Sequence, residues 1–143
     1  MKTYLKQIVR KGLSKLVGAE DLPRLLNDLK HLSETFVFSV DGFPMKMPWI
    51  LRKTIGRIIM RQVLRSNEMK EGIKVPDRFI PEPGADSRAE AEALRGAIKL
   101  FSAHPGPFAE HPFFGTMTRD QWDHLHRIHC AHHLSFAQPS GLA

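Results

Sequence analysis

Residues 122–136 read Trp122-Asp123-His124-Leu125-His126-Arg127-Ile128-His129-Cys130-Ala131-His132-His133-Leu134-Ser135-Phe136. Five of the eight histidines of this 143-residue chain fall within ten positions of this stretch. Its apolar and imidazole side chains recur at helical spacing, and Thr118 and Gln121 just before it have the spacing of a capping box. These patterns predict one amphipathic helix over about 118–138, with imidazole in its buried stripe.

His129 and His133 are the two histidines best placed to act together. Side chains four residues apart on a helix lie one above the other, so both ring nitrogens can reach one metal ion with bonds of about 2.0–2.1 Å. A solvated face, a set of hydrogen-bonded core histidines, or adventitious metal binding would also explain a histidine-rich helix. Two ligands do not complete a site, so another segment has to supply a third.

The composition indicates one globular domain over residues 1–143. The apolar share of 42% and the charged share of 25% are ordinary for such a domain, and no apolar run approaches the roughly 18 residues that a membrane span requires. The single cysteine, Cys130, excludes an internal disulfide framework and suits a reducing compartment. With no secretory signal visible, we expect a cytoplasmic protein.

The net charge of +6 is unevenly distributed along the chain. Residues 1–15 carry five basic side chains and no acid, and residues 46–70 carry seven against Glu68 alone. Arg57, Arg61 and Arg65 stack four apart, and we expect them to be exposed. A basic face can meet nucleic acid, an anionic membrane or anionic small molecules, or can simply be solvated.

The remaining apolar patterns predict helices and no strand. Helices are expected over 22–40 (capped by Asp21), 48–65 (opened by Pro48) and 87–103 (capped by Ser87 with Glu90). The other segments are predicted as a short basic helix within 1–20, a long proline-rich crossover over 71–86 and a flexible tail over 139–143. The predicted fold class is all-α, with the apolar stripes packed in a mostly antiparallel bundle.

His31 flanks the apolar side of the helix predicted over 22–40. It shares a turn with Asp28, so it can face the interior of the bundle while Asp28 or another neighbour orients its second ring nitrogen. An isolated helical histidine is otherwise a hydrogen-bonded boundary residue, and this alternative stays open on the local pattern alone.

The order of these features resembles the DinB-like superfamily of metal-binding four-helix bundles. The resemblance is carried by His31 on an early helix, a basic helix, a proline-rich crossover and His129-Cys130-Ala131-His132-His133 on the last helix. Within the superfamily, the segments 39–44, 111–115 and 125–136 resemble a branch described as a domain of unknown function. The superfamily pattern, one histidine on the second helix and HxxxH on the fourth, implies a divalent metal bound by His31, His129 and His133.

The resemblance also implies a type of activity. Three neutral imidazoles on a divalent ion, zinc or nickel, leave an open coordination position that water or a thiol can occupy. Relatives in the superfamily include thiol-dependent transferases, so we expect a metal-dependent transferase or hydrolase with a small-molecule substrate, and a low-molecular-weight thiol as a candidate partner. His126 and His132 are candidate proton carriers, and His126 is also an alternative ligand.

Two further expectations concern partners. Where the superfamily has a full first helix, this chain offers only a short basic segment, so we expect that helix to be shortened or missing. The bundle would then have an apolar groove, and we expect a homodimer across it. The rival to an enzyme is a helical binding module whose basic face meets nucleic acid or an anionic surface while the histidines are structural. Because the arginine stripe lacks the interleaved aromatic residues of a single-strand binder, we do not expect nucleic acid as the partner.

Overall fold

The computed structural model describes residues 22–70 and 86–135. The predicted basic helix within 1–20, its neighbour Asp21, nearly all of the crossover and the tail lie outside these ranges. The described residues form five helices: α2 (Leu22–Asp41), α3 (Trp49–Lys53), α4 (Ile55–Ser66), α5 (Ser87–Ala103) and α6 (Arg119–Leu134). They contain no strand, only an isolated bridge between His111 and Gly115. The predicted all-α class is therefore confirmed, and none of the described helices could span a membrane.

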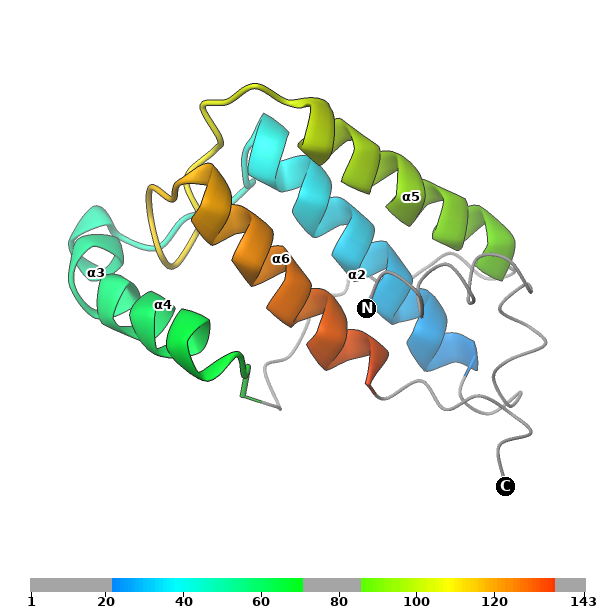
Figure 1. The fold of residues 1–143 in the computed structure, drawn as a ribbon, viewed down its shortest axis with the longest axis horizontal. Helices are drawn as coiled ribbons and strands as arrows, with labels where there is room; N and C mark the ends of the chain where they lie inside the picture. Colours follow the sequence, from blue (N-terminus) through cyan, green and yellow to red (C-terminus); the bar gives the residue numbers. More distant parts are fainter. Residues whose placement is uncertain (1–21, 71–85, 136–143) are drawn as a thin grey trace.

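α2 lies in the middle of the structure, with α5 along one side and α6 along the other (Figure 1). α2 occupies this central position because the apolar side chains of α2 recur every three or four residues and face both α5 and α6. Those that are buried are Leu25, Leu29, Leu32 and Phe36. α5 meets this stripe with Ala91, Leu94, Ala97 and Phe101. The two alanines add little bulk, which allows close approach of α5 to α2.

The directions of the helices differ from the mostly antiparallel arrangement that we expected. α6 runs against α2, because Asp28 contacts His133 while Phe36, two turns further along α2, stacks on His126. α5 runs parallel to α2, since Phe36 also contacts Phe101 near the end of α5, with ring centroids 5.7 Å apart. A short hairpin cannot join parallel neighbours, so the 45 residues between α2 and α5 return the chain to the starting end.

α4 packs on α6 and runs parallel to it. Arg57 near the start of α4 donates to the backbone oxygen of Thr116 at 2.6 Å, and Asn67 just after α4 accepts from His124 Nε2 at 2.6 Å. Arg57 is therefore half-buried, contrary to the expectation that the whole arginine stripe is exposed, while Arg61 and Arg65 are exposed as predicted.

The single helix expected over 48–65 is broken at Thr54, whose backbone leaves helical geometry with φ −111° and ψ −94°. The reason lies in the packing of Gly56, where a Cβ atom would stand 2.0 Å from the backbone oxygen of Phe113. The bend at Thr54 turns α4 so that Gly56 meets this segment, and the Thr54 hydroxyl donates to the Ile50 oxygen at 2.7 Å.

We expected the apolar stripe of residues 48–65 to enter the core, but most of it does not. Gly56 and Met60 are the buried residues of α4, and α3 has none. The large apolar side chains of these two helices that stay exposed are Trp49, Ile50, Leu51, Ile55, Ile58 and Ile59.

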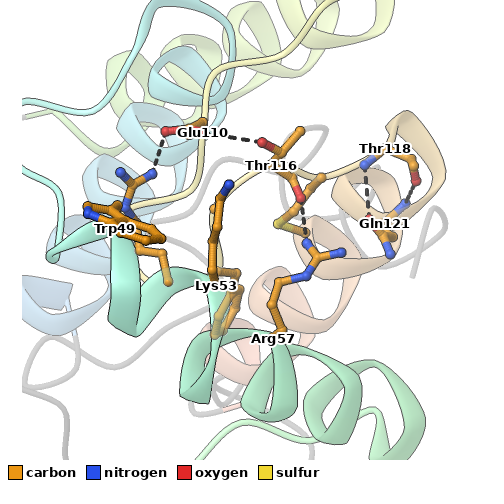
Figure 2. Close-up of a pocket in the computed structure, with 11 residues that line it drawn as sticks. Trp49, Lys53, Arg57, Glu110, Thr116, Thr118 and Gln121 are labelled. Atoms are coloured by element: carbon orange, nitrogen blue, oxygen red, sulfur yellow. Dashed lines mark hydrogen bonds and ion pairs between the residues drawn. The ribbon is translucent and has the colours of Figure 1, made fainter.

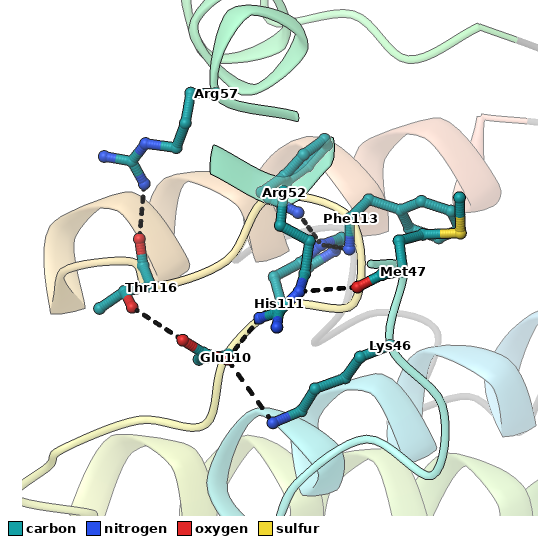
Figure 3. Close-up of polar contacts among 9 residues, drawn as sticks. Lys46, Met47, Arg52, Arg57, Glu110, His111, Phe113 and Thr116 are labelled. Atoms are coloured by element: carbon teal, nitrogen blue, oxygen red, sulfur yellow. Dashed lines mark hydrogen bonds and ion pairs between the residues drawn. The ribbon is translucent and has the colours of Figure 1, made fainter. Parts of the chain in front are cut away.

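Glu110 fastens the loop before α6 to the α3 region (Figure 3). Its carboxylate accepts from Arg52 and from the Thr116 hydroxyl, and the Lys46 ammonium lies 3.7 Å away. The Arg52 hydrogen bond lowers the pKa of Glu110, so the carboxylate is charged when it holds this loop. Arg52 also donates to the backbone oxygen of Met47 at 2.9 Å. It therefore links the loop before α3 to the loop before α6.

α6 begins where the sequence predicts. The Thr118 hydroxyl accepts from the Gln121 backbone at 3.2 Å and the Gln121 side chain accepts from the Thr118 backbone at 3.0 Å, which completes the capping box. α5 differs by one residue from the prediction, because Asp86 rather than Ser87 caps it by accepting from the Arg88 backbone.

Two glycine replacements test the close contact at Gly56. Gly56→Ala should lower the free energy of unfolding by about 1–3 kcal/mol, because the new methyl group would collide with backbone rather than with a flexible side chain. Gly96→Ala, inside α5 with open space around the new atom, should raise it by about 0.5–1 kcal/mol. Urea denaturation of both variants measures this, and equal effects at the two positions would contradict the packing described.

Candidate metal centre

His31, His129 and His133 come together between α2 and α6. Each can offer one ring nitrogen such that the three ligand atoms lie within 4.8 Å of one another. The ring centroids form a nearly equilateral triangle, with separations of 4.8, 4.9 and 4.7 Å. The closest atoms are His31 Nε2 and His129 Nε2, 2.9 Å apart. The arrangement is one that could hold a metal ion.

Two features of the chain produce this triangle. The spacing of four residues on α6 places His129 and His133 on the same side of the helix, one turn apart. His31 comes from the middle of α2, and because α2 and α6 are antiparallel neighbours its ring reaches the two rings of α6 from the opposite side. The first two residues are brought close by local helix geometry and the third by tertiary packing.

Asp28 supports the cluster from α2. Its carboxylate oxygen Oδ1 accepts a hydrogen bond from Nδ1 of His133 at 2.8 Å, and both side chains are largely buried. The proton of His133 is thereby held on Nδ1, which leaves the Nε2 lone pair available to an ion. The sequence predicted that Asp28 orients the ring of His31. In the structure, the hydrogen bond of Asp28 is to His133.

Burial keeps two of the three imidazoles neutral at neutral pH. It lowers the pKa of His31 to about 4, helped by the neighbouring His133 and partly opposed by the negative charge of Asp28. Burial also lowers the pKa of His129 well below its usual value, and the surrounding histidines add to this effect. A neutral imidazole is the form that binds a metal, so these rings need not lose a proton first.

The donor set fits a divalent ion of the zinc type. Two nitrogens bound at a tetrahedral angle lie about 3.3 Å apart, which is only slightly wider than the 2.9 Å between the Nε2 atoms of His31 and His129. Three imidazoles with a carboxylate behind one of them are a familiar set of ligands for zinc, nickel, copper and iron. Cys130 is not a member of the set; it is buried, and burial raises the pKa of its thiol to about 12.

The structure places the other histidines of α6 differently. His126 is buried, stacks on Phe36 with centroids 3.8 Å apart, and lies 3.2 Å from the Ser39 hydroxyl. That hydroxyl donates to the Phe36 oxygen, so it accepts from His126 Nε2. This ring therefore does not join the triangle. The role of Ser39 was not predicted, because nothing local in the sequence links it to a histidine 87 positions later.

His132 and His124 are the two remaining histidines of α6, and both are half-buried. The ring of His132 contacts that of His133, with centroids 5.4 Å apart, so it borders the triangle. The helical pattern of residues 118–138 predicts that His124 faces solvent, but its side chain is half-buried and donates to Asn67 just after α4.

A separate hollow of about 550 Å³ lies near the start of α6. Figure 2 shows Trp49, Lys53 and Arg57 on one side of it and Glu110, Thr116 and the capping pair of α6 on the other. None of the three clustered histidines lines it. The aromatic segment 108–116 packs on the first turn of α6, since the rings of His111 and Trp122 are in contact with centroids 5.4 Å apart.

The fold and this cluster define an all-α protein whose three converging histidines could hold one metal ion. The sequence motifs suggested a domain of unknown function, and the comparison with protein families agrees. The chain belongs to the family described as Protein of unknown function (DUF1569), which matches residues 5–140. No curated protein and no solved structure matches the chain.

His111 offers a test of how buried histidines set the acid stability of the fold. Its Nδ1 accepts from the backbones of Phe113 and Phe114, both at 3.1 Å, and burial lowers its pKa to about 3. The folded protein thus resists protonating His111, while the unfolded chain takes up the proton near pH 6.5. The contribution of His111 to the free energy of unfolding is therefore fully present above about pH 6.5 and is lost as the pH falls toward 3.

The variant His111→Asn keeps a side-chain acceptor for the two backbone groups but cannot be protonated. Its unfolding midpoint should therefore fall less than that of the wild type between pH 7 and pH 4.5, as measured by thermal denaturation monitored by circular dichroism. An unchanged slope against pH would mean that His111 is protonated in the folded protein.

Proposed function

We propose that the protein binds one divalent metal ion through His31, His129 and His133 and that this ion is the centre of its activity. The observation that carries the proposal is the convergence of three ligand nitrogens within 4.8 Å from two helices. The hydrogen bond from His133 to Asp28 supports it, because metal-binding histidines almost always have such a partner on their second nitrogen.

A bound divalent ion with three imidazole ligands would supply Lewis acidity and lower the pKa of a water or thiol in its open position. The residues of the chain have separate tasks in this scheme. Asp28 holds the proton of His133 on Nδ1 and fixes the orientation of that ring. His132, whose ring touches His133, is the proposed proton carrier at the edge of the centre. We propose a structural task for His126, since its Nε2 proton is given to Ser39.

The class of reaction rests on the resemblance to the DinB-like superfamily and on the open position together. Both favour a transferase that uses a low-molecular-weight thiol, or a hydrolase, acting on a small molecule. Zinc and nickel are the first candidates for the ion. Cobalt-substituted protein would test the open position, because a thiol such as 2-mercaptoethanol should change its visible absorption spectrum if that position is accessible.

Metal binding itself is tested on protein stripped with a chelator. Titration with zinc or nickel, followed by calorimetry and elemental analysis, should show one ion per chain and raise the unfolding midpoint as free metal increases. His31→Ala, His129→Ala or His133→Ala should each abolish this stoichiometric binding.

His124→Ala is the matched control, because it removes a histidine of the same helix that bonds to Asn67 outside the cluster. It should keep one ion per chain. Circular dichroism spectra are compared for all four variants, so that loss of metal is separated from loss of fold. Equal binding by the wild type and a folded His129→Ala variant would remove the proposed centre.

Asp28→Asn tests the supporting carboxylate. The amide oxygen can still accept from His133 Nδ1, so the fold should persist, but the charge that makes the imidazole a better ligand is lost. Removal of such partners typically weakens metal binding by about 10–100-fold. Competition against a chromophoric chelator measures the change, and an unaltered affinity would mean that Asp28 has no part in binding.

A further inference from the structure

The α3–α4 face is an apolar surface that residues 22–70 and 86–135 leave uncovered. We define it by Trp49, Ile50, Ile55, Ile58 and Ile59, of which Trp49 and Ile58 are each 63% exposed and Ile55 is 56% exposed. Single exposed apolar residues are ordinary, but a group of this size within eleven consecutive positions marks an interaction site in a soluble protein.

α4 packs on the rest of the protein through a different sector of its surface, so the exposure of its isoleucines is not the result of a detached helix. Gly56 and Met60, four apart, face the interior, with Met60 only 1% exposed. Ile55, Ile58 and Ile59 occupy a second sector of the helix, because residues three and four apart share a face. Arg57, Arg61 and Arg65 form a third sector between the other two. α4 therefore presents both an apolar and a basic sector away from the core.

The charge around the α3–α4 face has one sign. Residues 45–66 carry six basic side chains and no acidic one. Arg52 and Lys46 interact with Glu110, but among the described residues no carboxylate pairs with Lys53, Arg61 or Arg65, which are exposed. The Lys53 ammonium lies 5.7 Å from the centroid of the Trp49 ring, and Figure 2 shows the two side chains next to each other. A partner of this surface therefore has to offer apolar contacts to the isoleucines and negative charge to the neighbouring arginines.

Four occupants of the α3–α4 face can be compared on this basis. A second copy of the chain in a symmetric dimer would bury the isoleucines but would bring two strongly basic faces together. Residues 1–15, with five basic and no acidic side chains, would meet the face with the same repulsion. Nucleic acid would neutralise the arginines but would leave the isoleucines in water, since phosphates offer no apolar contact. A bilayer surface with anionic headgroups provides both contacts at once.

We propose that the α3–α4 face docks on a membrane surface rich in anionic lipid. The isoleucines enter the boundary between headgroups and acyl chains, and Trp49 lies at the headgroup level, where its ring is favoured. Lys53, Arg61 and Arg65 meet the lipid phosphates from the flank. This attachment is peripheral and independent of the histidine cluster, which lies on the α2 side of α6.

The test is flotation of the full-length protein with vesicles. Vesicles of phosphatidylcholine mixed with phosphatidylglycerol should carry the protein, while vesicles of phosphatidylcholine alone should carry much less. Ile58→Asp should reduce partitioning roughly tenfold or more, because it replaces a buried apolar contact by a charge of the wrong sign. Arg61→Gln with Arg65→Gln should weaken binding and flatten its dependence on salt.

The matched control is Leu100→Asp, which changes an apolar side chain of α5 that is 42% exposed but lies outside the α3–α4 face. It should bind vesicles like the wild type. Because Ile58 makes no core contact, Ile58→Asp should keep the wild-type unfolding midpoint. Trp49 fluorescence should shift to the blue with anionic vesicles only, and the Trp49→Phe variant should lose that shift.

Three results would overturn the proposal. Equal binding to neutral and anionic vesicles would remove the role of the basic sector. A dimer in sedimentation velocity that Ile58→Asp dissociates, with no vesicle binding, would identify a second copy as the occupant. Tight binding of a DNA or RNA duplex that Ile58→Asp leaves intact, again without vesicle binding, would assign the surface to nucleic acid.

Discussion

Burial of neutral imidazole between α2 and α6 is the constraint on which the centre of this protein depends. A polar ring in the interior costs free energy unless its nitrogens find partners, and here the partners are other rings and one carboxylate. His31 and His129 meet through their Nε2 atoms at 2.9 Å, and His133 gives its Nδ1 proton to Asp28. The same lowered pKa values that keep His31 and His129 uncharged also make them suitable ligands.

Two kinds of interface around α2 make this possible. On the α5 side the contact is apolar and close, because small side chains such as Ala91 and Ala97 alternate with Leu94 and Phe101. On the α6 side a row of histidines replaces part of the apolar stripe, and His126 is accommodated by stacking on Phe36 and by the Ser39 hydroxyl. The apolar interface supplies stability, which leaves the other interface free to hold polar groups.

The histidine cluster and the α3–α4 face are separated by α6. One side of α6 presents the imidazoles to α2, and α4, whose Met60 is buried, packs on another. Gly56 of α4 meets the backbone of Phe113 in the segment before α6. α4 thus contacts α6 with a narrow strip of its surface and turns its isoleucines, Arg61 and Arg65 outward. On the two proposals together, the protein would bring a metal centre close to an anionic membrane without exposing the centre to lipid.

The sequence by itself determined the features that depend on local periodicity: the helical class, the capping box at Thr118 and Gln121, and the shared face of His129 and His133. These follow from neighbours three or four positions apart. The approach of His31, 98 positions from His129, rested on a resemblance, and the bond from Asp28 to His133 spans 105 positions. The tertiary structure alone decided that bond, the parallel course of α5, the bend at Thr54 and the outward isoleucines. Each of these depends on which surfaces meet after the helices form, and a one-dimensional pattern shows that a face is apolar without showing what covers it.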